Sequence, residues 1–147
     1  MDIREATAAD RDWAAALMAG SDPWLRLGAT LDSLRHMCFD PRYEVWVAVR
    51  DGQRLGVAVL QDKGLAGSPY LKSIAVDPEL RGHGVGSALL DFAEARWSGE
   101  ARWFFLCVSS FNRRARDLYE RRGYGVVGEL PDQVVDGSSE TVMRKRI

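Results

Sequence analysis

The chain has few of the residues that build disulfide frameworks or metal sites. Its 147 residues include two cysteines and two histidines. Cys38 and Cys107 lie far apart in the sequence, which argues against a disulfide scaffold or a zinc site. We therefore expect no bound metal and, because two thiols without a partner suit a reducing compartment, a cytoplasmic protein.

Excess charge and long apolar runs are also missing. Lys and Arg total 20 against 21 for Asp and Glu, a net charge of −1, whereas nucleic-acid surfaces usually need a clear basic excess. No stretch approaches the ~18 apolar residues of a membrane span, and the N-terminus has no signal-peptide pattern. We expect neither a nucleic-acid nor a membrane partner, and a single domain over residues 1–147.

Hydrophobic periodicity and turn signals predict an α/β chain. Thr7 begins a helix-capping pattern, and Asp51-Gly52 predicts a hairpin. Residues 63–69, rich in Gly and polar side chains, are predicted to form a loop. In chain order we predict a strand at 1–6, helices at 7–19 and 30–38, strands at 44–50, 54–61 and 70–76, a helix at 85–97, a strand at 102–108, a helix at 113–122, and strands at 124–130 and 140–147.

A glycine-rich turn joins the strand at 70–76 to the helix at 85–97. It reads Arg81-Gly82-His83-Gly84-Val85-Gly86-Ser87 and follows Pro78. Glycines leave backbone N–H groups uncovered, and a helix N-terminus presents unpaired N–H groups with a partial positive charge. The turn is therefore suited to bind phosphate, and Arg81 adds a full charge at its rim.

Other phosphate-binding and catalytic motifs do not match. A P-loop needs a lysine after its last glycine, and none follows Gly86. A dinucleotide-binding fingerprint needs glycine where Ser87 stands, and it belongs to the first unit of a longer sheet. The G-x-S-x-G elbow of many hydrolases is missing.

The pattern V-x-P-x-x-R-G-x-G-x-G resembles the acetyl-CoA loop of the GNAT superfamily of N-acetyltransferases. A second segment is similar to the same family: strand residues 106–111, then Asn112, then a helix that ends in Leu118-Tyr119-Glu120-Arg121-Arg122-Gly123-Tyr124. Asn112 is also a good helix N-cap, and Gly123 suits the left-handed position after a helix. The resemblance covers essentially the whole chain.

The resemblance implies a mixed, mostly antiparallel sheet that is splayed between its fourth and fifth strands and flanked by helices, with CoA bound in the splay. Main-chain groups of Ile74, Ala75 and Val76 would bind the pantetheine, and a backbone N–H near Val76 would stabilise the oxyanion. The loop would hold the pyrophosphate, with His83 contributing only its backbone N–H. The cofactor-binding residues are then Ile74, Ala75, Val76, Arg81, Gly82, His83, Gly84, Val85, Gly86, Ser87 and Asn112.

Tyr119 matches the family tyrosine that often protonates the departing CoA thiolate, and it lies two turns after Asn112 on the same helix face. The sequence leaves the identity of the general base open. Some relatives have a glutamate five residues before the Asn, where this chain has Cys107, so a relayed water, Glu44 or Glu140 remain alternatives.

The arginines of the helix at 113–122 admit a simple interpretation. Arg113–Asp117, Arg116–Glu120 and Asp117–Arg121 are spaced as i,i+4 ion pairs, so we expect most of these arginines on a solvated face.

In this family the first two helices, their connection and the last hairpin wall the acceptor pocket, which implies Trp24 and Trp46 as substrate-contacting residues. We therefore expect direct acetyl transfer from acetyl-CoA to a primary amine of a small molecule, peptide or protein, by a monomer or homodimer. The alternative is a CoA-binding regulatory module of the same fold without catalysis.

Overall fold

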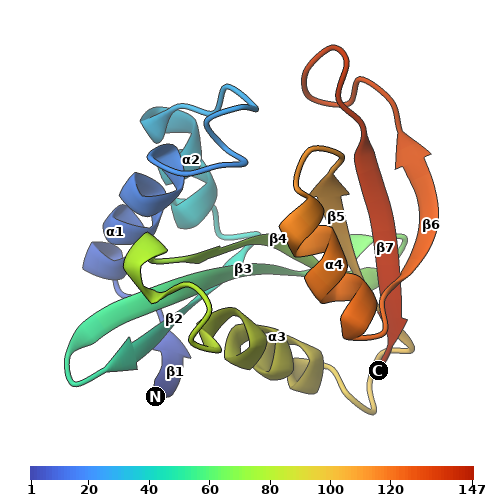
Figure 1. Ribbon diagram of the computed structural model, residues 1–147. Coiled ribbons are helices and arrows are strands. Elements are labelled where there is room, and N and C mark those ends of the chain that lie inside the picture. The colour runs from blue at the N-terminus through green and yellow to red at the C-terminus, as the bar shows by residue number, and fades with distance from the viewer.

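The structure, a computed structural model, describes residues 1–147 and contains a seven-stranded sheet with helices on both faces (Figure 1). The sheet order is β1-β2-β3-β4-β5-β7-β6, and every neighbouring pair is antiparallel except β4 and β5. The elements are β1 (Asp2–Glu5), α1 (Ala8–Ala19), α2 (Leu31–Phe39), β2 (Glu44–Arg50), β3 (Gln53–Leu65), β4 (Ser68–Val76), the 3₁₀ turn η1 (Pro78–Leu80), α3 (Val85–Arg96), β5 (Trp103–Ser109), α4 (Arg113–Arg121), β6 (Gly125–Leu130) and β7 (Glu140–Arg146).

The sheet separates in its middle, as expected. β4 and β5 pair only through Tyr70 with Phe105 and Leu71 with Leu106. Beyond these residues the two strands diverge, and β5, β7 and β6 stand at a steep angle to β1–β4 (Figure 1). The β4 backbone from residue 73 to 76 therefore has a partner on the β3 side alone. The predicted mixed, splayed sheet is confirmed.

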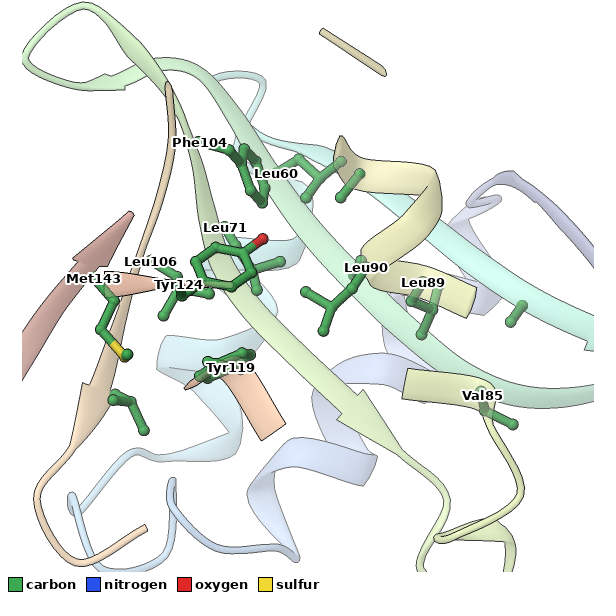
Figure 2. Close-up of a cluster of buried hydrophobic side chains, with 14 of the residues drawn as sticks. Leu60, Leu71, Val85, Leu89, Leu90, Phe104, Leu106, Tyr119, Tyr124 and Met143 are labelled. Atoms are coloured by element: carbon green, nitrogen blue, oxygen red, sulfur yellow. The ribbon is translucent and has the colours of Figure 1, made fainter. Parts of the chain in front are cut away.

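Two apolar cores hold the sheet between its helices. One core lies under α1 and α2 and includes Met18, Val57 and Ala75. The larger core joins α3 and α4 to the opposite face. None of the helices is long and apolar enough to cross a membrane. Labelled members of the larger core in Figure 2 are Leu60, Leu71, Val85, Leu89, Leu90, Phe104, Leu106, Tyr119, Tyr124 and Met143.

Most element boundaries follow from local signals. Thr7 and Asp10 form a reciprocal capping box at α1, and Gly123 has a φ of 96° after α4. The prediction of a loop at 63–69 was wrong, because β3 continues to Leu65 and β4 starts at Ser68, around a turn at Ala66-Gly67. A ribbon that extends past the body of the sheet needs only backbone pairing, so its side chains can be polar.

A partly buried ionic cluster links the end of α4 to α3. The Arg122 guanidinium binds Asp91 and Glu94 of α3. Glu94 also accepts hydrogen bonds from the Tyr124 hydroxyl at 3.0 Å and from Lys145 Nζ at 2.6 Å. Because several partners share one carboxylate, the helix that carries Tyr119 is held in a defined position.

Candidate active site

A cleft of about 750 Å³ opens where β4 and β5 part. Its walls come from the turn after α1, the free part of β4, the glycine loop with the start of α3, the end of β5, and α4. Ile74, Ala75 and Val76 line it, as do Asn112 and Tyr119. The tertiary fold thus brings together both segments that carried the family resemblance.

The glycine loop presents an uninterrupted run of free backbone donors. None of the N–H groups of residues 81–87 donates to a protein acceptor, and the first helical bond runs from Ala88 N–H to the Gly84 carbonyl at 3.0 Å. Gly82 and Gly84 have φ values of 82° and 83°, and no protein atom lies within 4 Å of an added Cβ at either position. Backbone conformation therefore requires glycine there, and the exposed donors fit an anion such as pyrophosphate.

Four arginines that line the cleft lack a carboxylate partner. Arg81, Arg113, Arg114 and Arg121 all line the cleft, and none forms an ion pair. The predicted pairs of Asp117 with Arg113 and Arg121 are therefore wrong. Only Arg116 pairs with Glu120, at 3.1 Å. Arg113, Arg114 and Arg121 are exposed, as expected of a solvated face, and a phosphate-bearing ligand in the cleft would find their positive charge uncompensated.

His83 and Asn112 have local structural roles. The His83 ring is exposed, with Nδ1 3.1 Å from the Arg81 carbonyl oxygen, and His83 does not line the cleft. The Asn112 side chain accepts the Ala115 N–H at 3.3 Å, so it caps α4 as predicted.

Tyr119 places a free hydroxyl at the cleft. The side chain is 5% exposed and packs edge-on against Tyr124, with ring centroids 5.7 Å apart (Figure 2). Its hydroxyl forms no hydrogen bond within the protein, yet it is not sealed from solvent-accessible space. Burial raises the pKa of Tyr119 to about 12. The phenol therefore keeps its proton at neutral pH and can donate it only to a group that enters the cleft.

Cys107 also lines the cleft, on β5. Burial raises the pKa of its thiol, which disfavours the thiolate needed for nucleophilic or base chemistry. Its neighbour across the parting strands, Lys72, is exposed and has no ion-pair partner.

The two carboxylates left open by the sequence lie in different places. Glu44 binds Arg96 of α3 through two hydrogen bonds, of 2.9 and 3.0 Å, and also accepts the Trp46 indole N–H. Trp46 packs against Phe92, with ring centroids 4.7 Å apart. Neither Glu44 nor Trp46 lines the cleft, whereas Glu140 does.

Trp46 was expected at the acceptor pocket, and the structure does not place it there. β2 turns this side chain to the α3 side of the sheet. Trp24 does line the cleft, in the turn after α1. From the same turn, the Arg26 guanidinium lies 4.9 Å from the centre of the Phe111 ring at the opposite wall. No sequence signal pairs Arg26 with Phe111, because only the fold brings them together.

No group of three or more His, Cys, Asp or Glu side chains is arranged to hold a metal ion.

Comparison with known proteins agrees with this geometry. Residues 41–126 match the sequence model of the acetyltransferase (GNAT) domain. The chain is 28% identical to N-acetylaspartate synthetase from Danio rerio over 104 residues, which cover 68% of this chain and 36% of that protein. The chain thus spans about a third of that relative's length.

Two solved structures illustrate the similarity of the fold. A nourseothricin acetyltransferase has a TM-score of 0.64 and 32% identity, over 73% of this chain and 66% of that chain. A ribosomal-protein-alanine N-acetyltransferase from Brucella melitensis has a TM-score of 0.77 and 23% identity, over 100% of both chains. With more than half of its length matched by the domain model, the chain belongs to the acetyltransferase (GNAT) domain family.

Proposed function

We propose that this protein transfers the acetyl group of acetyl-CoA directly to a primary amine. The observation that carries the proposal is the meeting of three features at one cleft: the free donors of residues 81–87, the free edge of β4, and the unbonded hydroxyl of Tyr119. A binding site alone would not require the third feature.

The chain's own groups fit CoA along the length of the cleft. The glycine loop would hold the pyrophosphate, and the arginines without ion-pair partners would bind the remaining phosphate group of CoA. The main chain of residues 74–76 would bind the pantetheine as an added strand would, since the β5 side of this edge is free. A backbone N–H of the same segment, near Val76, would stabilise the oxyanion.

The reaction forms a carbon–nitrogen bond and breaks the carbon–sulfur bond of the thioester. The proton lost by the amine nitrogen finally resides on the CoA thiol, so no other reactant is needed. Tyr119 would act as the general acid at the sulfur. A thiol with a pKa of ~8.5 is a stronger acid than the Tyr119 phenol, so full proton transfer from the phenol to the thiolate is unfavourable. The main contribution of Tyr119 is therefore a hydrogen bond to the negative charge that develops on the sulfur.

The acceptor is a primary amine of a small molecule, a peptide or a protein. Trp24 and Phe111 supply aromatic surface at the acceptor end, and Arg26 and Asp22 supply charge. The relatives above are named for nourseothricin, for an alanine of a ribosomal protein and for N-acetylaspartate, so they span small and large acceptors.

We further propose that residues 1–147 act as one cytoplasmic catalytic domain, as a monomer or homodimer, without a metal, nucleic-acid or membrane partner. One continuous sheet, two cysteines without a disulfide and the net charge of −1 support this proposal.

Two measurements test the function. Calorimetric titration should show that CoA binds more tightly than ATP or NAD. Incubation with acetyl-CoA and a panel of aminoglycosides, polyamines, amino acids and peptide N-termini should release free thiol, with acetylated product found by mass spectrometry. Binding of CoA with no thiol release across the panel would favour the regulatory module, and tighter binding of ATP or NAD would contradict the CoA site.

A further inference from the structure

The cleft contains two acidic side chains, and only one of them is free. Asp22 accepts the backbone N–H of Arg26 at 3.3 Å and lies 3.9 Å from the Arg26 guanidinium Nε. Glu140 is half-buried and has no hydrogen bond or ion pair. A half-buried carboxylate without a partner inside a cleft is available to an incoming cation.

Glu140 stands at the point where the sheet has parted. It is the first residue of β7 and lies opposite Ser109, the last residue of β5. Antiparallel partners project to the same face, and successive residues alternate. Val108 packs in the core with Tyr119, so Ser109 and Glu140 belong to the opposite face. Glu140 and Tyr119 therefore approach the cleft from opposite sides of the sheet.

This separation suits the two proton movements of amine acetylation. An alkyl amine with a pKa of ~10.4 is an ammonium ion at neutral pH and must lose a proton before it can attack. The proton acceptor belongs on the side where the amine enters, and the donor belongs beside the leaving sulfur.

No other polar group near Glu140 is suited to accept a proton from the amine. Burial raises the pKa of both the Cys107 thiol and the Tyr70 phenol, so both stay neutral. The residue opposite Glu140 on β6 is the apolar Leu130. Tyr70 of β4 and Cys107 of β5 lie near Glu140, and Lys72 lies near Cys107. The other charged residues that line the cleft are Asp22, Arg26, Arg81, Arg113, Arg114 and Arg121.

We infer that Glu140 is the general base of this enzyme and accepts a proton from the ammonium group of the acceptor. One N–H proton of the ammonium ion moves to the carboxylate, and the freed lone pair forms the carbon–nitrogen bond at the thioester carbonyl. The carbon–sulfur bond then breaks, the second N–H proton ends on the CoA sulfur, and the carboxyl group returns the first proton to solvent. This assignment rests on the proposed function. It also accounts for catalysis in a chain that has Cys107 where some relatives have a glutamate.

The test is the pH dependence of kcat/KM for the panel amine with the highest activity, between pH 6 and 10 at saturating acetyl-CoA. At pH 7 we expect Glu140→Gln to lower kcat/KM by about 10²–10³-fold. Its rate should then rise about tenfold per pH unit, because only the neutral fraction of the amine reacts, and should approach the wild-type rate near pH 10. The wild-type profile should be much shallower.

Two further variants separate catalysis from structure. Glu140→Asp keeps the carboxylate and should recover part of the activity at pH 7 with a shallow profile. Glu44→Gln removes the other candidate carboxylate, outside the cleft, and should follow the wild type. CoA affinity, measured by calorimetry, should be unchanged in all three variants.

The assignment is overturned if Glu140→Gln follows the wild-type profile, or if its loss is the same at every pH. If Glu140→Gln fails to fold, a Glu140→Asp profile that rises tenfold per unit also overturns it. If the wild type transfers acetyl to no panel amine while binding CoA, the proposed function fails together with this assignment. The variant results that overturn the Glu140 assignment still require a wild-type enzyme that acetylates an amine. Failure of the assignment is therefore distinguishable from failure of the proposed function.

Discussion

Replacing Tyr119 with phenylalanine isolates the chemistry of one hydroxyl. The ring packs against Tyr124 in the larger core, and phenylalanine keeps that packing (Figure 2). The hydroxyl has no hydrogen-bond partner within the protein, so its removal leaves no buried polar group unpaired. We therefore expect the free energy of unfolding to change by less than about 1 kcal/mol.

The expected kinetic effect follows from the charge on the leaving sulfur. A hydrogen bond to a charged group contributes about 1.5–3 kcal/mol, which corresponds to a factor of roughly 10–10² in rate. Partial proton transfer raises the effect toward the usual range for a general acid, about 10²–10⁴-fold. We expect kcat to fall about 10²-fold. Because the pKa of Tyr119 is about 12, neither enzyme should show a descending limb from this group below about pH 11.

The assay is steady-state thiol release with the best panel amine, together with CoA titration and thermal unfolding. Tyr124→Phe is the matched control. Its hydroxyl bonds to Glu94, at 3.0 Å, and Tyr124 does not line the cleft. The control should lose about 1–3 kcal/mol of stability and keep kcat. A Tyr119→Phe enzyme with near wild-type kcat, when acetyl transfer limits the rate, would show that the thiolate leaves unassisted.

Three other predictions concern the loop, the thiol and alkaline stability. Gly84→Val imposes a branched side chain at a φ of 83° and should weaken CoA binding at least tenfold, about 1.4 kcal/mol; unchanged affinity in a folded variant would refute the loop assignment. Cys107→Ala should keep most of kcat, because its raised thiol pKa disfavours the thiolate; a loss above about a thousandfold with CoA binding intact would mean catalysis through sulfur. Since the pKa of Tyr119 rises from ~10 unfolded to about 12 folded, its contribution to stability is complete below pH 10 and is lost as pH rises toward 12. Chemical denaturation should show that, between neutral pH and pH 11, the free energy of unfolding of the wild type falls by roughly 1.4 kcal/mol more than that of Tyr119→Phe. Equal pH dependence of the two proteins would contradict the raised pKa.

The sequence by itself determined the features that depend on residues close together in the chain. The glycine loop with its unpaired N–H groups, the Asn112 cap and the Gly123 helix end are each set within a few residues, by local backbone conformation. The spacing of Asn112 and Tyr119 fixes their shared helix face. Hydrophobic periodicity predicted the order of strands and helices correctly. The extent of β3 and β4 was wrong at 63–69, because a polar ribbon carries no such periodicity.

Only the tertiary structure decided which distant side chains enter the cleft. Nothing in the sequence distinguishes Glu44 from Glu140, but register and strand direction turn one to Arg96 and the other to the parted edge of the sheet. The same cause keeps Trp46 out of the cleft, whereas Trp24 lines it. The register of strand pairing sets the face of the sheet on which a side chain lies, and the point where the pairing stops decides whether that side chain reaches the cleft. Both depend on contacts between segments far apart in the chain.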